Sequence, residues 1–170
     1  MRILGIDPGS RVTGYGIIES IGGRLRYLHA GQVQCAQGEL PERLMKIHGK
    51  LQVVVSEYQP QEVAIEKVFV NRNVASALTL GQARGAAICA VAAVDRPVHE
   101  YAPTQIKNAV VGTGRADKAQ VQHMIQILLS LRAKPPSDAA DALAVAVCHA
   151  NVRNTFARSG VQLSRAWGGA

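Results

Sequence analysis

The sequence predicts an α/β protein built on one mixed sheet with helices on both faces. Strand-like apolar runs come first, over residues 3–34, and only after Leu40 do apolar residues recur at helical spacing. From there short strands alternate with helices, a pattern typical of strands added to an α/β sheet. The length of 170 residues suits a single domain with a full hydrophobic core.

The first three strands are expected to form an antiparallel meander. The run that starts at Ile3 ends on Asp7, where Pro8-Gly9 breaks it, and Gly22-Gly23 is a strong signal for a tight hairpin. The expected elements, in chain order, are strands over 3–7, 13–20 and 25–34, a helix over 40–58, a strand over 62–66, a helix over 73–92, a strand over 98–101, a short helix over 104–110, a helix capped at 117 and a last helix over 138–151.

The helix over 73–92 stands out because Arg84 is its one charged residue. So little charge predicts burial on most of its sides. Its small residues, among them Gly81 and Gly85, would permit close approach by another helix. A core role and a subunit interface both fit, and the sequence favours the core.

Charge and composition limit the possible partners and locations. The net charge of +7, from 19 Lys and Arg against 12 Asp and Glu, favours an anionic partner such as nucleic acid, although a merely basic soluble protein has the same balance. The small-residue apolar run over 85–94 is too short to cross a bilayer, and residue 1 leads directly into a strand pattern without a secretory signal. Three cysteines without C-x-x-C spacing indicate reduced thiols and argue against zinc. We therefore expect a cytoplasmic protein without membrane association.

Four acids form the candidate site. Asp7 and Glu66 each end a strand, while Asp138 and Asp141 are the charges of an otherwise apolar helix, three residues apart and so able to point at one spot. Structural alternatives exist: Asp7 would cap the turn after Pro8, and Asp138 would bond the Asp141 N–H in a capping box. What favours a site is the coincidence of three apolar segments that all present carboxylate.

A cluster of this kind needs cations. Two carboxylates about 4 Å apart repel by roughly 1 kcal/mol in water and roughly 4 kcal/mol at an effective dielectric of 20. Oxygen ligands suit Mg²⁺ or Mn²⁺, and two such ions can hold the attacking water and the leaving oxygen of an in-line phosphoryl displacement. The five histidines show no ligand spacing and are expected to be surface or core residues. An acidic hole in a basic surface is what a metal-dependent nuclease requires.

Several motifs in chain order belong together. They are Gly5-Ile6-Asp7-Pro8-Gly9-Ser10 with Gly14-Tyr15-Gly16, Ala64-Ile65-Glu66, Leu80-Gly81-Gln82-Ala83-Arg84-Gly85 and Asp138-Ala139-Ala140-Asp141-Ala142-Leu143. With these motifs, spread over roughly residues 1–150, the chain resembles the RuvC-type Holliday junction resolvases. The resemblance implies a ribonuclease-H-like five-stranded fold, a homodimer, and Mg²⁺-dependent symmetric nicking of two strands of a four-way DNA junction in recombination and repair, which leaves 5′-phosphate and 3′-hydroxyl ends.

The same resemblance implies roles for particular residues. It makes Asp7, Glu66, Asp138 and Asp141 the metal-binding catalytic acids; some relatives carry His where this chain has Asp138, so the ligand set here is all carboxylate. It also implies DNA binding by Phe69, which would stack on bases beside Arg72, and by Lys107 and Lys118, which would hold phosphates. From the residues alone, Phe69 would be a loop residue folded onto the core and Lys118 a solvated lysine.

The resemblance further implies the RuvA and RuvB branch-migration proteins as partners. We expect a nuclease domain over 1–151 and a basic, flexible tail over 152–170. Two alternatives remain. The Gly-Ile-Asp-x-Gly-Ser opening also occurs in actin-like and sugar-kinase ATP-binding modules, although those need two lobes and this chain has the length of one. A scaffold that binds junctions without cutting them would not need all four acids.

Overall fold

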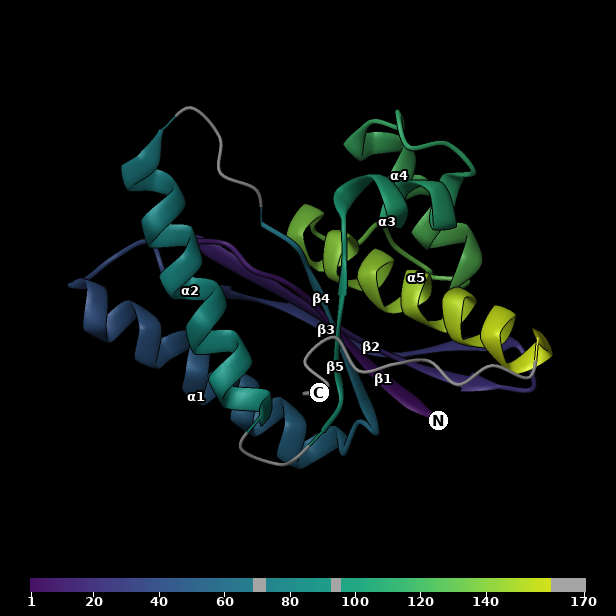
Figure 1. The fold of residues 1–170 in the computed structure, drawn as a ribbon, viewed down its shortest axis with the longest axis horizontal. Helices are drawn as coiled ribbons and strands as arrows, with labels where there is room; N and C mark the ends of the chain where they lie inside the picture. The colour runs from purple at the N-terminus through teal and green to yellow at the C-terminus, as the bar shows by residue number, and fades with distance from the viewer. Residues whose placement is uncertain (69–72, 93–95, 160–170) are drawn as a thin grey trace.

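A computed structural model describes residues 1–68, 73–92 and 96–159, which form a five-stranded sheet in the order β3-β2-β1-β4-β5 with helices on both faces (Figure 1). The predicted fold class is confirmed. The elements are β1 (Arg2–Asp7), β2 (Val12–Ile21), β3 (Arg24–Gln34), α1 (Leu40–Tyr58), β4 (Glu62–Glu66), α2 (Val74–Ala92), β5 (Val98–Tyr101), α3 (Pro103–Val111), α4 (Lys118–Leu128) and α5 (Ser137–Ser159).

The first three strands form the predicted antiparallel meander. Gly22 and Gly23 join β2 to β3 with φ angles of 56° and 83°, a conformation that L side chains disfavour and that a tight hairpin requires. β4 then pairs in parallel with β1, and β5 in parallel with β4. The ends of β1 and β4 therefore meet at the same edge of the sheet, with Asp7 on one strand and Glu66 on the other.

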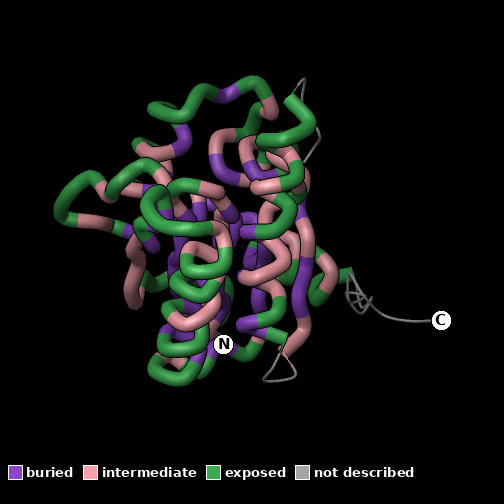
Figure 2. Tube along the Cα trace, turned by 90° about the vertical axis from the view of Figure 1, so that its left-hand side faces the viewer, coloured by how far each residue is buried: buried purple, intermediate pink, exposed green. Residues whose placement is uncertain are grey.

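Two hydrophobic cores fill the two faces of the sheet. One lies between the sheet and α3, α4 and α5, and the other between the sheet and α1 and α2 (Figure 1). In Figure 2 the buried stretches lie inside the molecule and the exposed turns of the helices outside them. Most of the first half of α5 is buried, because it packs on β1 and β2 through alanines and other small apolar residues.

Glycines let α5 approach the sheet at backbone distance. A Cβ on Gly5 would lie 2.1 Å from the carbonyl oxygen of Ala142, and a Cβ on Gly14 would lie 2.0 Å from that of Asp138. No real Cβ contact is that short, so any other residue at either position would push the helix away. The bare backbone of β1 and β2 thus fixes where the acidic turns of α5 lie.

The prediction that α2 is buried on most of its sides is wrong for the single chain. Its Ala83, Ala87 and Ala90 pack into the core, but Val74 and Leu78 are 65% and 64% exposed. By length and composition the helix is also long and apolar enough to cross a membrane, and 22% of its most apolar 18-residue stretch is buried. The expectation that no segment is long enough to cross a bilayer, which rested on the uncharged run over 85–94, is therefore wrong; core helices of soluble proteins have the same length and composition.

The last helix is longer than predicted. It was expected to end near Asn151, but α5 continues to Ser159. Tertiary contacts hold the extra turns: the Asn151 side chain donates to the carbonyl oxygen of Ala109 on α3 (3.1 Å), and the Arg153 guanidinium forms an ion pair with Glu62 on β4. Residues 160–170, the rest of the predicted tail, lie outside the described residues.

Candidate functional site

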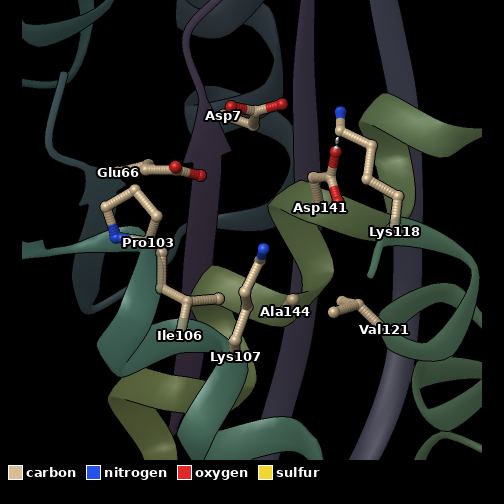
Figure 3. Close-up of a pocket in the computed structure, with 9 residues that line it drawn as sticks. All are labelled: Asp7, Glu66, Pro103, Ile106, Lys107, Lys118, Val121, Asp141 and Ala144. Atoms are coloured by element: carbon tan, nitrogen blue, oxygen red, sulfur yellow. Dashed lines mark hydrogen bonds and ion pairs between the residues drawn. The ribbon is translucent and has the colours of Figure 1, made fainter. Parts of the chain in front are cut away.

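A hollow of about 240 Å³ opens where β1 and β4 end (Figure 3). We call it the carboxylate hollow; its lining is Asp7, Glu66, Pro103, Ile106, Lys107, Lys118, Val121, Asp141 and Ala144. Two acids come from neighbouring parallel strands, the third from α5, and the two lysines from α3 and α4. The structure thus brings together three of the four predicted acids and both predicted lysines.

Asp138, the fourth acid, lies beside the carboxylate hollow without lining it. Its Oδ2 accepts a hydrogen bond of 2.7 Å from Nε2 of Gln32 on β3. Its charge still helps to raise the pKa of Asp7, so the two carboxylates interact. Gln32 holds the Asp138 side chain from 106 positions away in the chain. The sequence does not reveal this contact, because no spacing rule links positions so far apart.

The turn after Asp7 has its own stabilising residue. The Gly9 N–H donates to Oγ1 of Thr13 (3.3 Å), and the Thr13 hydroxyl donates back to the Gly9 carbonyl (3.0 Å). Thr13 is completely buried. These bonds fill the structural role that one alternative gave to Asp7, whose carboxyl instead lies in the carboxylate hollow (Figure 3).

Electrostatic strain is concentrated on Asp7 and Glu66. Burial, followed by the charges of Glu66, Asp141 and Asp138, raises the pKa of Asp7 to about 8, against a smaller opposing effect of Lys118. Burial and Asp141 raise the pKa of Glu66 to about 7, opposed by Lys118 and Lys107. Near neutral pH the pair therefore retains protons that isolated carboxyls would have released.

This strain indicates what the site can hold. A cation among the carboxylates would displace those protons and remove the repulsion between the acids. The side-chain donors of the four acids are all carboxylate oxygens, which are the ligands of hard divalent cations such as Mg²⁺ and Mn²⁺. The residues present therefore fit a divalent metal.

The two lysines lie at the rim of the acids. Nζ of Lys118 is 2.9 Å from Oδ2 of Asp141, and that contact raises the pKa of the lysine. The Lys118 side chain is 73% exposed, so its ammonium group can reach both Asp141 and a ligand from solvent. Lys107 points toward the acids from α3 (Figure 3). Phe69 and Arg72, the other predicted DNA-binding residues, lie outside the described residues.

The sheet order and the carboxylates at the ends of β1 and β4 are those of a nuclease with the ribonuclease-H-like fold. A family model described as "Crossover junction endodeoxyribonuclease RuvC" matches residues 3–149. The protein of that name from Shewanella amazonensis is 55% identical over 162 residues, which cover 95% of this chain and 94% of that protein. The chain therefore belongs to the RuvC family of crossover junction endodeoxyribonucleases.

Solved structures agree with this assignment. The structure of Thermus thermophilus RuvC has a TM-score of 0.81 and 36% identity, and covers 95% of this chain and 98% of that one. The same protein in complex with Holliday junction substrate has a TM-score of 0.81 and 34% identity, with 94% and 97% covered. The chain is thus a nuclease of a family that works through a divalent metal. This membership favours the nuclease over the ATP-binding alternative.

Proposed function

We propose that this protein resolves four-way (Holliday) junctions in homologous recombination and repair by symmetric, Mg²⁺-dependent nicking of two strands. The observation that carries the proposal is the carboxylate hollow, whose Asp7 and Glu66 have raised pKa values, in a chain of the RuvC family. The T. thermophilus relative, similar over nearly its whole length, has been captured on a Holliday junction.

In this proposal Asp7, Glu66, Asp138 and Asp141 are the catalytic acids and hold two Mg²⁺ ions per site, which Mn²⁺ could replace. When bound, the metal supplies an activated water and stabilises the leaving oxygen, so that cleavage gives 5′-phosphate and 3′-hydroxyl ends. Asp7 and Glu66 must first release their protons, and burial keeps these two carboxyls poised to exchange a proton for a cation near neutral pH.

Binding of DNA would rest on basic residues around this acidic site. Lys118 is exposed and paired with Asp141, so it can turn from the carboxylate to a phosphate. Lys107 lines the carboxylate hollow and would contact the phosphate next to the one being cut. Phe69 and Arg72 follow Glu66 closely in the chain and are proposed to hold unpaired bases and their phosphates at the crossover. The net charge of +7 attracts DNA from a distance.

Symmetric nicking requires two sites, and α2 offers a surface for a homodimer. Its exposed Val74 and Leu78 form an apolar outer face, and a Cβ on Gly81 or Gly85 would meet nothing within 4 Å. A second copy of α2 could therefore pack closely against it.

The oligomeric state tests this interface. Leu78→Glu should give a monomer by analytical ultracentrifugation and abolish paired nicking. Ile127→Glu, which alters an exposed apolar residue on α4, should leave the dimer intact. Dimers in both variants would exclude α2 as the interface.

RuvA and RuvB would be the partners of this dimer in a cytoplasmic setting.

The experiment that tests the activity is cleavage of a synthetic four-way junction in Mg²⁺, with a plain duplex of the same sequence as control. Asp7→Asn should abolish cleavage and leave junction binding intact, because the substitution removes a metal ligand and keeps the basic surface. Full activity in this variant would refute the assigned mechanism. Equal cleavage of duplex and junction would refute the assigned substrate.

A further inference from the structure

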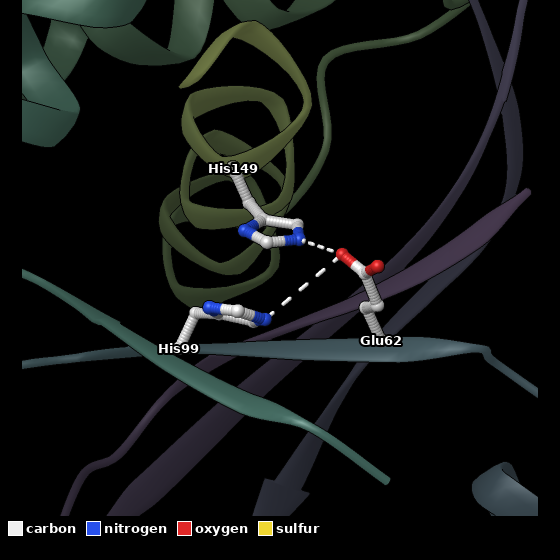
Figure 4. A group of neighbouring side chains, drawn as sticks. All are labelled: Glu62, His99 and His149. Atoms are coloured by element: carbon white, nitrogen blue, oxygen red, sulfur yellow. Dashed lines mark hydrogen bonds and ion pairs between the residues drawn. The ribbon is translucent and has the colours of Figure 1, made fainter. Parts of the chain in front are cut away.

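A second cluster of ionisable side chains lies at the opposite end of the sheet. It consists of Glu62, His99 and His149, which come from β4, β5 and α5 (Figure 4). Glu62 precedes Glu66 by four residues on β4, and His149 follows Asp141 by eight on α5. At about 3.3 Å per strand residue and 1.5 Å per helix residue, the cluster lies roughly 12 Å from the carboxylate hollow.

The cluster is buried and its nitrogen and oxygen atoms converge. His149 is 0% and His99 6% exposed, and the side chain of Glu62 is 13% exposed. Nε2 of His149 is 2.6 Å from Oε2 of Glu62, and Nε2 of His99 is 4.0 Å from the same oxygen. One atom from each residue lies within 4.8 Å of the others. Two imidazoles and a carboxylate thus face one point between α5 and the sheet.

These donors differ in kind from those of the catalytic acids. Imidazole nitrogen and carboxylate oxygen together are typical ligands of Zn²⁺ and other late first-row cations, whereas Mg²⁺ prefers oxygen alone. Tetrahedral Zn²⁺ with bonds of about 2.0–2.1 Å holds its ligand atoms about 3.3 Å apart. The His149–Glu62 separation of 2.6 Å is shorter than this distance and the His99–Glu62 separation of 4.0 Å is longer, so side-chain movements on the order of 1 Å would close the site.

We infer that Glu62, His99 and His149 form a second divalent-metal site, which binds Zn²⁺ or a similar cation and ties α5 to β4 and β5. Its role is structural, because it lies far from the catalytic acids and connects three elements. The absence of C-x-x-C spacing argued against a zinc site with cysteine ligands. Glu62, His99 and His149 come from three separate segments, so they leave no spacing signature in the sequence.

Neighbouring groups complete the site. Oη of Tyr101 is 2.7 Å from Nδ1 of His149, so it holds the ring with Nε2 turned toward Glu62, as an outer partner of a metal-bound histidine does. Arg153 pairs with the other carboxylate oxygen, Oε1, which leaves Oε2 to the metal. Burial raises the pKa of Glu62, but the hydrogen bond from His149 and the charges of His149, Arg153 and His99 outweigh it and lower the pKa. Glu62 is therefore ionised at neutral pH.

Arg153 provides a specific test of the inference, because its positive charge competes with a metal ion for the Glu62 carboxylate. Its side chain is 44% exposed and can move into solvent when a cation binds. Arg153→Gln should therefore bind Zn²⁺ more tightly than the wild type. If the three side chains are joined only by hydrogen bonds and bind no metal, this variant will show no gain in Zn²⁺ affinity.

The test is Zn²⁺ titration of the full chain by calorimetry, after treatment with a chelator and with excess Mg²⁺ present to fill the catalytic acids. We expect one Zn²⁺ per chain, an increased Tm, and Co²⁺ absorption bands of a tetrahedral site with nitrogen ligands. His99→Phe should weaken Zn²⁺ binding ~100-fold or more, while the exposed control His123→Gln and the catalytic variant Asp7→Asn should keep it.

The possible results distinguish failure of the Zn²⁺ site from failure of the proposed nuclease function. His99→Phe should still nick junctions in Mg²⁺, because the residue lies outside the catalytic acids. Unchanged Zn²⁺ binding in His99→Phe, or no binding by the wild type, would overturn the inference. If His99→Phe fails to fold, Arg153→Gln decides: tighter Zn²⁺ binding supports the site, and unchanged or weaker binding overturns it.

Discussion

Replacement of Asp7 by Asn tests the electrostatics of the carboxylate hollow through stability, without an activity assay. Burial and the neighbouring acids raise the pKa of Asp7 to about 8 in the folded protein, whereas an Asp in an unfolded chain titrates near 3.9. Between these two values the folded state keeps a proton that the unfolded state has released. The free energy of unfolding of the wild type therefore falls as the pH rises through this range, in the absence of metal. Asn does not titrate, so the free energy of unfolding of the variant does not fall with pH for this reason.

The size of the effect follows from the one proton involved. A difference of one bound proton changes the free energy of unfolding by about 1.4 kcal/mol per pH unit. Between about pH 5.5 and 7.5 the advantage of Asp7→Asn over the wild type should grow by up to ~2.7 kcal/mol. Partial exposure of the carboxyl reduces this to roughly 2 kcal/mol, which corresponds to about 4–8 °C in Tm for a chain of this size.

The assay is thermal unfolding of both proteins followed by circular dichroism, in EDTA, at several pH values. Excess Mg²⁺ should then reverse the order, because it stabilises the wild type by binding to the native carboxylates and has a weaker site in the variant. A Tm difference between the two proteins that stays constant from about pH 5.5 to 7.5 would show that Asp7 is ionised throughout. Asp7 would then not retain a proton until a cation replaces it.

Further predictions concern a lysine, two glycines and a glutamine. Lys118→Gln should weaken junction binding at low salt and reduce the slope of log Kd against log salt concentration by about 1, because one phosphate contact is lost; an unchanged slope would place Lys118 outside the DNA contact. Gly5→Ala should destabilise the fold by ~3 kcal/mol or more in urea unfolding, since its Cβ would collide with a carbonyl of α5. Gly49→Ala, in open space on α1, should stabilise the fold by ~0.5–1 kcal/mol. Similar effects of the two substitutions would contradict the close approach of α5. Gln32→Ala should raise the Mg²⁺ concentration needed for half-maximal cleavage several-fold, because Asp138 loses the partner that orients it, and an unchanged requirement would make that bond irrelevant to the metal.

The sequence was sufficient for the sheet and for the position of each acid at the end of its strand or the start of its helix, because both depend on local patterns. Period-two apolar runs and Gly22-Gly23 predict the meander, and a strand that ends on Asp7 or Glu66 delivers its acid to the end of the sheet. The spacing of Asp138 and Asp141 places both on the first turns of a helix. How closely that helix lies against the strands depends on glycines whose function only the packing reveals.

What the sequence did not predict depends on contacts between distant segments. A helix with little charge can be apolar for the core or for a second chain, and the pattern of α2 is the same in both cases. The extension of α5 beyond Asn151 relies on Arg153 reaching Glu62, 91 positions earlier. The same holds for Glu62, His99 and His149, which three separate elements bring to one place. Spacing rules describe one helix or one strand and carry no information on such meetings.

The contact between α5 and the bare backbone of β1 and β2 has a consequence for how this enzyme can change. The distance from Asp7 to Asp141 is set by main-chain atoms that touch at Gly5 and Gly14, not by side chains that could lengthen or shorten. Loops, the lysines and the outer face of α2 can vary without moving the acids relative to one another. Mutation can therefore alter these surfaces, while the spacing of Asp7 and Asp141, two of the proposed catalytic acids, is protected by two residues that have no side chain.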